Sequence, residues 1–396
     1  ATLVIYLGLG RIMAESGLVF LRGPLSAQAF TWHTLGTAGL GSKGAVAVAL
    51  TYAFFADAFN ACGIACLLCR RWWHAFFTDV FDACGTLTYE SAAPAATIDT
   101  VFDLASLTKV IATTTVVMQL FDQGQVRLED PVRRWIDDWR GDDRQQVSLA
   151  DLLEHASGLT SHLPLFRDHT SRVDFQHTIS TLPLEYVPRS QSIYSDLGFI
   201  LLGFLATDAA GGVGLDRQFS DIAERLQLGP LRYRPPADWR THTAPTEIEP
   251  WRGRLLQGEV HDENGWALGG VAGHTGLFGT APAVGRFARA LLRTLTGRPL
   301  VAKPATLGRF LRPTTVPGSS RALGWDTMLV TSSCGHRLSP DAIGHTGFTG
   351  TSLWVDPRQD LYVVLLTNRV HPTRDNEAIL SLRPAIHDAV VEALTR

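Results

Sequence analysis

Ser106 and Lys109 stand three residues apart, where a short polar stretch runs into an apolar segment that contains no glycine or proline. If a helix starts near Ser106, both side chains lie on one face of it. The start of a helix also supplies unpaired backbone N–H groups and a positive dipole end. A serine beside an amine, with such donors at hand, can act as an activated nucleophile. Taken alone, the pair is better explained as a serine cap followed by a surface lysine, because S-x-x-K spacing is common.

Two further motifs downstream change this interpretation. Tyr194-Ser-Asp196 stands at the start of a predicted buried helix, Tyr194–Ala210. His345-Thr-Gly347 stands just before a predicted β-hairpin. Each motif therefore places side chains that can move a proton or bind a substrate at the end of a regular element.

With these three motifs in this order, the chain resembles the penicillin-recognising serine hydrolases. That superfamily includes class C β-lactamases, D-alanyl-D-alanine carboxypeptidases and β-lactamase-like esterases. Its motifs are S-x-x-K, Y-x-N or a close variant, and K-T-G or H-T-G. The resemblance covers residues 85–396 and is poor upstream of Gly85. It reverses the first interpretation and implies that Ser106 is catalytic.

The resemblance implies a role for each motif residue. Ser106 attacks a carbonyl group to form an acyl-enzyme, which water or another acceptor resolves. Either Lys109 or Tyr194 takes the serine proton, and the sequence leaves that choice open because a coupled pair can share the proton. The backbone N–H groups of Ser106 and Phe348 form the oxyanion hole. The predicted catalytic residues are Ser106, Lys109, Tyr194 and His345, and the predicted substrate and oxyanion residues are Asp196, Thr346, Gly347 and Phe348.

Two motif positions depart from the usual pattern of the superfamily. Asp196 stands where an amide is more usual, so an acceptor replaces a donor. The change either alters the recognition of a substrate amide or lets the carboxylate pair with Lys109. His345 replaces the lysine of K-T-G and removes a permanent cation that could hold a substrate carboxylate. This second change argues against efficient β-lactamase action without excluding it.

The chain contains a second H-T-G triplet, His274-Thr-Gly276, inside the glycine-rich stretch Leu268–Gly279. No strand pattern precedes it, whereas alternating β residues follow His345. We therefore assign the motif role to His345 and expect His274 to support the wall of the cleft. His155 is likewise expected to anchor its own loop.

Composition limits the classes of partner. The 396 residues carry a net charge of -3, with 45% hydrophobic and 18% charged residues, and no block of Lys and Arg. A nucleic-acid partner is therefore not expected. Small neutral or weakly charged substrates fit this composition better, and the resemblance implies a small-molecule or peptidoglycan-peptide substrate with no cofactor and no metal. Cys62, Cys66 and Cys69 have a spacing that some iron–sulfur enzymes use, but in this apolar run small buried thiols are the preferred interpretation.

The pattern of elements predicts an α/β fold, an antiparallel sheet flanked by helices with an inserted mainly helical domain. The predicted organisation is an N-terminal segment of uncertain structure at 1–43, a sheet domain at 44–100 and 265–396, and a helical domain at 101–264 that carries Ser106 and Tyr194. The predicted strands are Gly85–Glu90, Thr351–Val355 and Leu361–Thr367, and the predicted helices include a short one capped by Ser148, Ala283–Thr296 and Ala378–Leu394, which Pro384 should kink or split.

The N-terminal quarter is harder to interpret. Gly44–Cys69 is long enough to span a bilayer, but Asp57 and Asn60 near its middle are costly there. A buried strand at Ala45–Tyr52 is the preferred alternative. No signal peptide pattern is evident, so a cytoplasmic and a periplasmic location both stay open.

The leading hypothesis from sequence is a serine acyl-hydrolase that acts on an ester or a D-Ala-D-Ala-type amide. A β-lactamase is one alternative, and a non-catalytic penicillin-recognising domain for binding or sensing is another. A membrane-anchored form of the hydrolase depends on Gly44–Cys69 and is not favoured.

Overall fold

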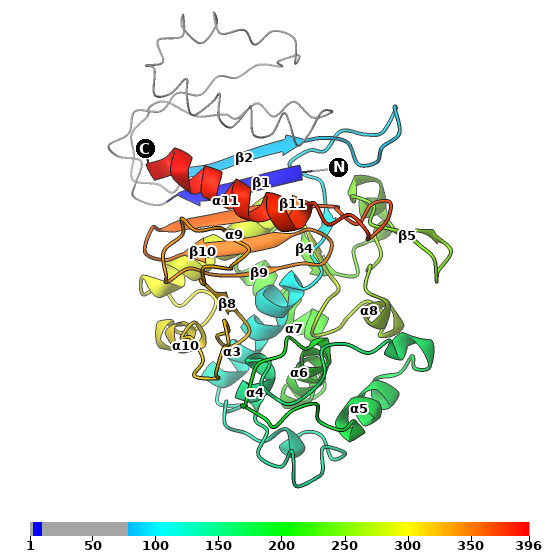
Figure 1. The fold of residues 1–396 in the computed structure, drawn as a ribbon, viewed down its shortest axis with the longest axis vertical. Coiled ribbons are helices and arrows are strands. Elements are labelled where there is room, and N and C mark those ends of the chain that lie inside the picture. The colour runs from blue at the N-terminus through cyan, green and yellow to red at the C-terminus, as the bar shows by residue number, and fades with distance from the viewer. Residues whose placement is uncertain (1–2, 10–77, 396) are drawn as a thin grey trace, which may run out of the picture.

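The computed structural model describes residues 3–9 and 78–395 (Figure 1). A large antiparallel sheet lies at one end of the molecule, and a mainly helical part lies at the other. The predicted strand Ala45–Tyr52, the candidate bilayer span Gly44–Cys69 and the three closely spaced cysteines lie outside the described residues. The α/β architecture expected from the sequence is confirmed.

The main sheet has six strands in the order β2-β1-β11-β10-β9-β8, and every neighbouring pair is antiparallel. The hairpin of β10 and β11 agrees closely with the two strands predicted there. The strand bounds are β1 Leu3–Leu9, β2 Thr78–Cys84, β8 Asp326–Thr327, β9 Ile343–Thr346, β10 Ser352–Asp356 and β11 Leu361–Thr367.

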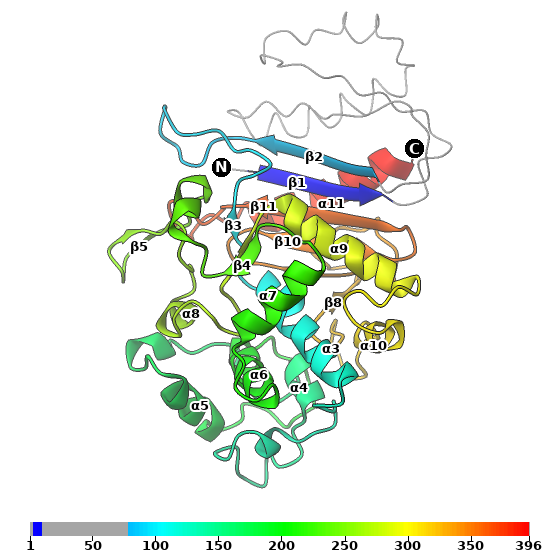
Figure 2. The ribbon, with the colours of Figure 1, turned by 180° about the vertical axis from the view of Figure 1, so that it is seen from behind.

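Strand β11 shows why the sheet carries helices on both faces. Its seven residues are all buried, and successive side chains of a strand point to opposite faces. Val363 and Leu365 pack in clusters with residues of α11 (Ile379–Thr395). Val364 and Leu366 belong instead to the large core that includes residues of α9 (Ala281–Leu295). Figures 1 and 2 show α11 over one face of the sheet and α9 over the other.

Two sequence expectations need correction in this layer. The predicted strand Gly85–Glu90 is wrong: the strand is β2, which ends at Cys84 because Gly85 turns the chain with a φ of 87°. Beyond this turn, Thr86 forms only an isolated bridge. Helix α11 runs through Pro384 as one helix, so of the two expected effects, a kink or a split, the split is not observed.

The first residues of the chain belong to the sheet. Strand β1 pairs with β11 from Leu3 opposite Thr367 to Leu9 opposite Leu361. On its other side it pairs with β2. The sequence left this segment without an assigned structure, and the structure places it between two strands.

The mainly helical part is built around α6, whose residues 197–206 are all buried. A helix that is apolar on all sides belongs in a core, and Figure 2 shows α6 and α3 within the helical part. The helix predicted from Tyr194 is therefore confirmed. Apart from α9 and α11, the α-helices of the described residues are α3 Thr114–Asp122, α4 Leu149–Leu153, α5 Arg172–Thr181, α6 Asp196–Ala209, α7 Leu215–Arg225, α8 Glu263–Ala267 and α10 Pro304–Phe310.

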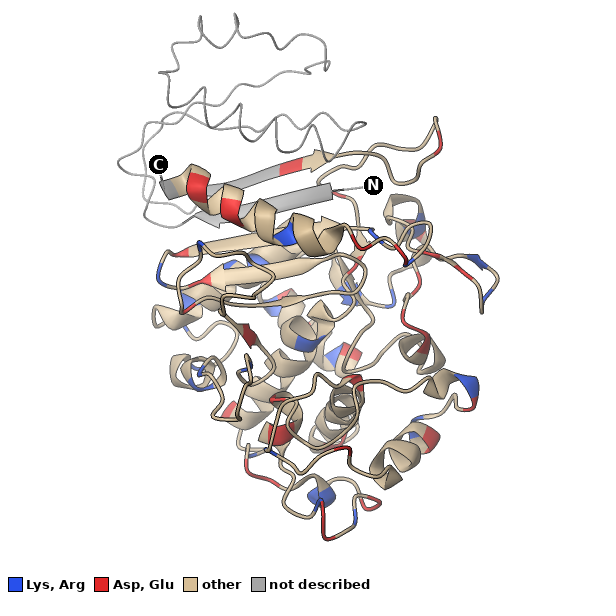
Figure 3. Ribbon diagram, in the orientation of Figure 1, with Lys and Arg blue, Asp and Glu red and all other residues tan. Residues whose placement is uncertain are grey.

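Two small sheets complete this part. One has the order β3-β7-β4, and the other pairs β5 with β6. Their strands are β3 Phe102–Asp103, β4 Leu231–Tyr233, β5 Ile248–Glu249, β6 Arg254–Leu255 and β7 Leu277–Gly279. Acidic and basic residues are interspersed over the helical part (Figure 3). Within the two described ranges, no helix has both the length and the apolar character needed to cross a bilayer.

Candidate active site

Ser106 lies in the turn between β3 and the long helical segment. That segment begins with a π-helix at Lys109–Thr113 and continues as α3. The turn is fixed from within, because the Ala105 backbone N–H donates to Asp103 Oδ1 at 2.9 Å and Ala105 adopts a positive φ of 46°. Such a φ is uncommon for alanine, and π-helical turns occur frequently at functional sites. The helix start predicted beside Ser106 is therefore confirmed.

The structure brings the first two motifs into direct contact. Lys109 Nζ donates to Ser106 Oγ at 3.0 Å, and the Tyr194 hydroxyl donates to the same Ser106 Oγ at 2.8 Å. Lys109 Nζ lies 2.8 Å from Asp196 Oδ1 in an ion pair, and the lysine side chain is fully buried. Of the two alternatives for Asp196, the structure therefore has the pairing with Lys109.

Tyr194 is held by the residues that start α6. Ser195 is the N-cap of α6: its side chain accepts from the Gly198 backbone N–H, and its hydroxyl donates to the Thr160 carbonyl at 2.7 Å. The Ser195 backbone N–H donates to His155 Nδ1 at 3.0 Å. The rings of His155 and Tyr194 lie 4.7 Å apart between centroids. The capping serine and the buried histidine together fix the direction in which the tyrosine points.

The third motif lies on β9, the strand context expected for it. His345 is buried, and its ring centroid is 5.8 Å from that of Tyr194. Its Nδ1 is 2.8 Å from the Thr346 carbonyl oxygen. Its Nε2 is buried and has no hydrogen-bond partner among the residues that the structure describes. An unpartnered ring nitrogen beside Tyr194 is available to a substrate group.

Gly347 is required where β9 passes the turn that carries Ser106. A Cβ atom on Gly347 would lie 2.6 Å from the Leu104 carbonyl oxygen and 2.1 Å from Thr351 Oγ1. The same two segments are joined by hydroxyl groups, since Thr351 donates to the Leu104 carbonyl at 3.1 Å and Thr349 to the Asp103 carbonyl at 2.8 Å. This close approach holds the residue after the motif, Phe348, beside the serine turn.

The predicted oxyanion donors are two backbone N–H groups. Among the described residues, neither the Ser106 nor the Phe348 backbone N–H donates to a carbonyl or side-chain acceptor. The Phe348 carbonyl accepts from Arg369 Nε at 2.8 Å, which fixes the orientation of the residue while its side chain stays 48% exposed. Two free N–H groups on segments that are tied together suit a developing oxyanion.

The glycine-rich loop closes the site behind Lys109. The His274 carbonyl oxygen accepts from Lys109 Nζ at 3.0 Å, while His274 Nε2 lies 2.9 Å from Asp262 Oδ1. The loop approaches α6 so closely that a Cβ on Gly273 would lie 1.9 Å from the Phe199 carbonyl oxygen. The first H-T-G triplet thus contacts the site through its backbone rather than as a strand motif.

Comparison with known proteins identifies the family. A family model described as Beta-lactamase matches residues 80–385. The chain belongs to the Beta-lactamase family. This confirms the resemblance drawn from the three motifs and makes the protein a serine hydrolase of that family.

Individual relatives agree with this assignment. A protein of Salmonella agona named "Putative D-alanyl-D-alanine carboxypeptidase" is 30% identical over 308 residues, which are 70% of this chain and 71% of that protein. Simvastatin synthase from Aspergillus terreus has the same fold, with a TM-score of 0.62 and 19% identity over 81% of this chain and 91% of that chain. EstCE1, a hydrolase with promiscuous acyltransferase activity, has a TM-score of 0.62 and 21% identity over 79% of this chain and 90% of that chain. At these identities the two structures support the fold alone.

Burial and mutual contacts shift the pKa values of three side chains at the centre of this β-lactamase-family site. Burial alone would lower the pKa of Lys109, but the Asp196 carboxylate, together with the Tyr194 hydroxyl, outweighs it and the net shift is upward. Burial alone would raise the pKa of Asp196, but Lys109 and the nearby His162 hold it well below its usual range. Burial raises the pKa of Tyr194, and Lys109 opposes this only in part. At neutral pH the site therefore holds an ammonium–carboxylate pair beside a neutral phenol.

His345 does not replace the cation of a K-T-G motif. Burial lowers its pKa well below the ordinary value for histidine, and the positive charges of Arg321 and Lys109 lower it further. The imidazole is therefore neutral at physiological pH. It can accept or donate one hydrogen bond through Nε2, but it cannot neutralise a substrate carboxylate.

We expect Asp196→Asn to shift the acidic limb of the pH profile of kcat/KM to lower pH. The carboxylate raises the pKa of both Lys109 and Tyr194. Removing it lowers both values, so whichever of the two is the base loses its proton at a lower pH. The profile of ester hydrolysis measures this shift. Asp221→Asn, which changes an exposed carboxylate on α7, serves as the matched control, and an unchanged or raised limb in Asp196→Asn would contradict the prediction.

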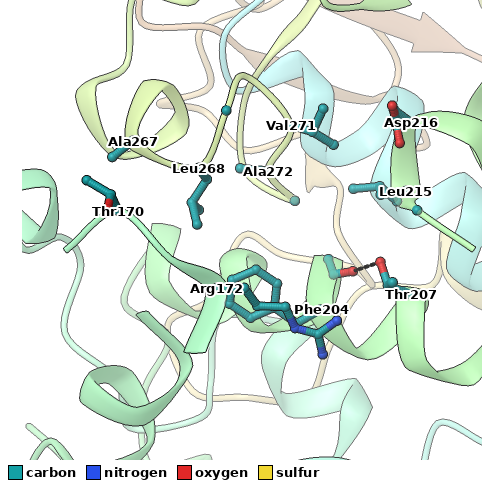
Figure 4. A pocket seen from close by; sticks show the side chains of 14 residues that line it. Thr170, Arg172, Phe204, Thr207, Leu215, Asp216, Ala267, Leu268, Val271 and Ala272 are labelled. Carbon is teal, nitrogen blue, oxygen red and sulfur yellow. Dashed lines mark hydrogen bonds between the residues drawn. The ribbon is translucent and has the colours of Figure 1, made fainter. Parts of the chain in front are cut away.

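A separate cavity of about 430 Å³ lies against the glycine-rich loop (Figure 4). Its lining comes from one face of α6, the start of α7 and the loop, and includes Phe204, Leu215 and Leu268. Arg172 lies across it and forms an ion pair with Asp208. None of the motif residues lines this cavity, so it is distinct from the site around Ser106.

In the described ranges of the chain, no group of three or more His, Cys, Asp or Glu side chains is arranged to hold a metal ion.

Sequence reasoning missed two residues near the motifs. His162 Nδ1 lies 3.7 Å from Asp196 Oδ2, and the Arg321 guanidinium lies 5.3 Å from the centroid of the Tyr194 ring. Neither belongs to a motif, and both stand in loops whose course no periodic pattern reveals. Only the folded chain shows that they face the site.

Proposed function

We propose that the protein is a serine acyl-hydrolase in which Ser106 forms an acyl-enzyme with an ester or a D-Ala-D-Ala-type amide. The observation that carries this proposal is the pair of hydrogen bonds to Ser106 Oγ, at 3.0 Å from Lys109 and 2.8 Å from Tyr194. A hydroxyl oxygen within reach of two proton-transfer groups, beside two free N–H donors, has the parts that nucleophilic acyl transfer requires.

In the proposed first step, Ser106 Oγ forms a bond to the substrate carbonyl carbon and the carbonyl electrons move to oxygen. The N–H groups of Ser106 and Phe348 stabilise that oxyanion. The serine proton passes through the Tyr194 oxygen to the leaving alcohol or amine as the bond to that group breaks. Water then adds to the acyl-enzyme by the reverse route and releases the carboxylic acid.

We assign the proton transfer to Tyr194 and a fixed charge to Lys109. Asp196 keeps Lys109 protonated, and an ammonium group cannot accept the serine proton. The Lys109 Nζ lies 4.9 Å from the centroid of the Tyr194 ring, where its charge favours the phenolate form. The two groups remain coupled, so the apparent pKa of the pH profile belongs to the pair.

A carboxypeptidase-like preference, with a peptidoglycan peptide as substrate, is the form of this proposal that the sequence relatives support best. The Salmonella agona protein carries that name and shares 30% identity with this chain. An ester substrate is the alternative, because the same nucleophile and oxyanion donors suit any acyl group with a leaving alcohol. Efficient β-lactamase action is the weaker candidate, because the neutral His345 offers no charge to the carboxylate of a β-lactam.

The test combines covalent labelling with a substrate panel. Intact-mass analysis after treatment with a fluorophosphonate, and separately with a penicillin, should show one adduct, which peptide mapping places on Ser106. Short-chain esters, a D-Ala-D-Ala peptide and a cephalosporin then show which acyl donors turn over. Adducts elsewhere in the chain would overturn the assignment of Ser106. Persistent acylation of Ser106 without turnover of any substrate would instead support a binding or sensing domain.

A further inference from the structure

His261 contacts both of the segments that carry the predicted oxyanion donors. It lies between β6 and α8, its side chain is buried, and it belongs to none of the three motifs. Its backbone N–H donates to Asp103 Oδ2 at 2.7 Å, and Asp103 Oδ1 accepts from the N–H of Ala105, the neighbour of Ser106. Its imidazole stacks on the ring of Phe348, with centroids 5.6 Å apart and planes 25° from parallel.

Asp103 joins the segments around the site at one buried carboxyl group. Each of its two carboxyl oxygens accepts one backbone N–H, from Ala105 and from His261. Its own carbonyl oxygen accepts from the hydroxyl of Thr349 at 2.8 Å, next to Phe348. The serine turn, the His261 segment and the residue after Phe348 are therefore held together by hydrogen bonds to a single residue.

Glu247, which immediately precedes β5, fixes the direction of the His261 ring. His261 Nε2 lies 2.9 Å from Glu247 Oε2, and both side chains are buried. Arg374 pairs with Glu247 at 2.6 Å and with Glu263 of α8 at 2.8 Å. Burial alone would raise the pKa of Glu247, but hydrogen bonds from His261 and Arg374 lower it to about 2. The carboxylate is thus charged at neutral pH and holds the imidazole from the side away from its backbone bond.

Phe348 depends on such contacts because the core does not enclose it. Its side chain is 48% exposed, whereas the His261 side chain stacked on it is buried. The guanidinium of Arg369 lies 4.4 Å from the centroid of the Phe348 ring, and Arg369 Nε donates to the Phe348 carbonyl at 2.8 Å. The direction of the Phe348 N–H therefore follows from the contacts of its ring and its carbonyl.

We propose that His261 is a positioning residue that aims the Phe348 backbone N–H at the oxyanion, by stacking on the Phe348 ring while Asp103 ties it to the serine turn. The inference rests on the proposed function and adds a residue to its machinery. His261 acts through Phe348 and does not contact the substrate. Since the oxyanion exists only in the transition state and the intermediate, the contribution of His261 falls on kcat rather than on KM.

A substrate pair that differs in one atom measures this positioning. In a thionoester, sulfur replaces the carbonyl oxygen of a chromogenic ester. Sulfur is larger and accepts hydrogen bonds more weakly, so two N–H donors held at the distance for oxygen favour the ester. The ratio of kcat/KM for the ester to that for the thionoester therefore reports on the oxyanion donors, and a residue that only fills space in the core would not change it.

Three substitutions of His261 separate its ring from its hydrogen bond. His261→Ala should lower kcat for the ester by about 10–100-fold and the oxygen-to-sulfur ratio by about tenfold. KM should stay within about twofold of the wild-type value. His261→Gln retains a polar group for Glu247 without a ring, and should behave like His261→Ala. His261→Phe retains a ring for Phe348 while Arg374 still neutralises Glu247, and should keep kcat and the ratio close to wild type.

The control and the normalisation make these effects specific. His169→Ala removes a histidine that also has one hydrogen bond, with Thr178, and one ring contact, with Phe175. It should keep the wild-type kcat and ratio. Titration of Ser106 to completion with a fluorophosphonate counts the folded sites in each variant, so that a loss of folded protein does not enter kcat.

The outcomes distinguish this inference from the proposed function. Wild-type kcat and ratio in His261→Ala and His261→Gln overturn the role of His261, while Ser106-dependent turnover of the ester leaves the proposed function standing. A variant that loses thermal stability but keeps the ratio per titrated site also overturns it, since His261 would then only pack the core. Failure of the wild-type protein to turn over either ester overturns both proposals.

Discussion

Ser106→Ala is expected to lower kcat for ester or peptide hydrolysis by about 10⁴-fold or more, with the fold retained. The substitution removes the atom that forms the acyl-enzyme, and groups that act as a unit with a nucleophile cannot compensate for its loss. The fold should survive because Lys109 keeps Asp196 at 2.8 Å and the His274 carbonyl at 3.0 Å as partners. Steady-state kinetics and circular dichroism measure the two effects.

A matched serine variant makes this result specific. Ser190→Ala changes an exposed serine whose hydroxyl donates only to the Val187 carbonyl, and it should leave turnover unchanged. Undiminished turnover in Ser106→Ala would remove Ser106 from the mechanism. Loss of covalent labelling by a fluorophosphonate in Ser106→Ala, but not in Ser190→Ala, would identify the labelled hydroxyl independently of the substrate.

Local spacing in the sequence predicted which neighbouring side chains share a helix face, and the family resemblance predicted which distant residues meet at the site. Ser106 and Lys109 can be placed on one face of a helix from their spacing alone. Tyr194 stands 88 residues from Ser106 in the chain, and no periodic pattern joins them. Their proximity could be predicted only because the three motifs resemble a known family. The strand context on which the choice between the two H-T-G triplets depends could be predicted, because residues alternate after His345, and the structure has β9 and β10 there.

The features that the sequence did not predict depend on contacts between residues far apart in the chain, and no motif marks them. Strand β1 pairs with β11 at the opposite end of the chain, and a short apolar run carries no information about its partner strand. Arg321 is one arginine among many in the sequence, and its position beside Tyr194 depends on the course of a loop. The pairing of Lys109 with Asp196 was one of two alternatives, because the direction of a carboxylate follows from packing that a linear motif does not specify.

Lys109→Met is expected to lower both stability and activity, and a second substitution should separate the two effects. The variant leaves the Asp196 carboxylate, whose side chain is 18% exposed, without its cation. Breaking one side of a buried ion pair costs about 3–5 kcal/mol of unfolding free energy. Because Lys109 depresses the pKa of Asp196, this loss is present at neutral pH and fades as the pH falls and the carboxyl becomes protonated. Urea unfolding at pH 7 and pH 4 measures it.

The double variant Lys109→Met with Asp196→Asn should recover most of that stability, because it buries no unpaired charge. It should not recover turnover. Without the ammonium 4.9 Å from the Tyr194 ring, the negative charge that develops on the Tyr194 oxygen during proton transfer is no longer stabilised, and kcat/KM stays lowered by about 10²–10⁴-fold. Stability that returns without activity assigns Lys109 a role in the reaction beyond balancing Asp196. A double variant that regains both would mean that the lysine serves only to neutralise the carboxylate, and Tyr194 would then have to accept the serine proton unaided.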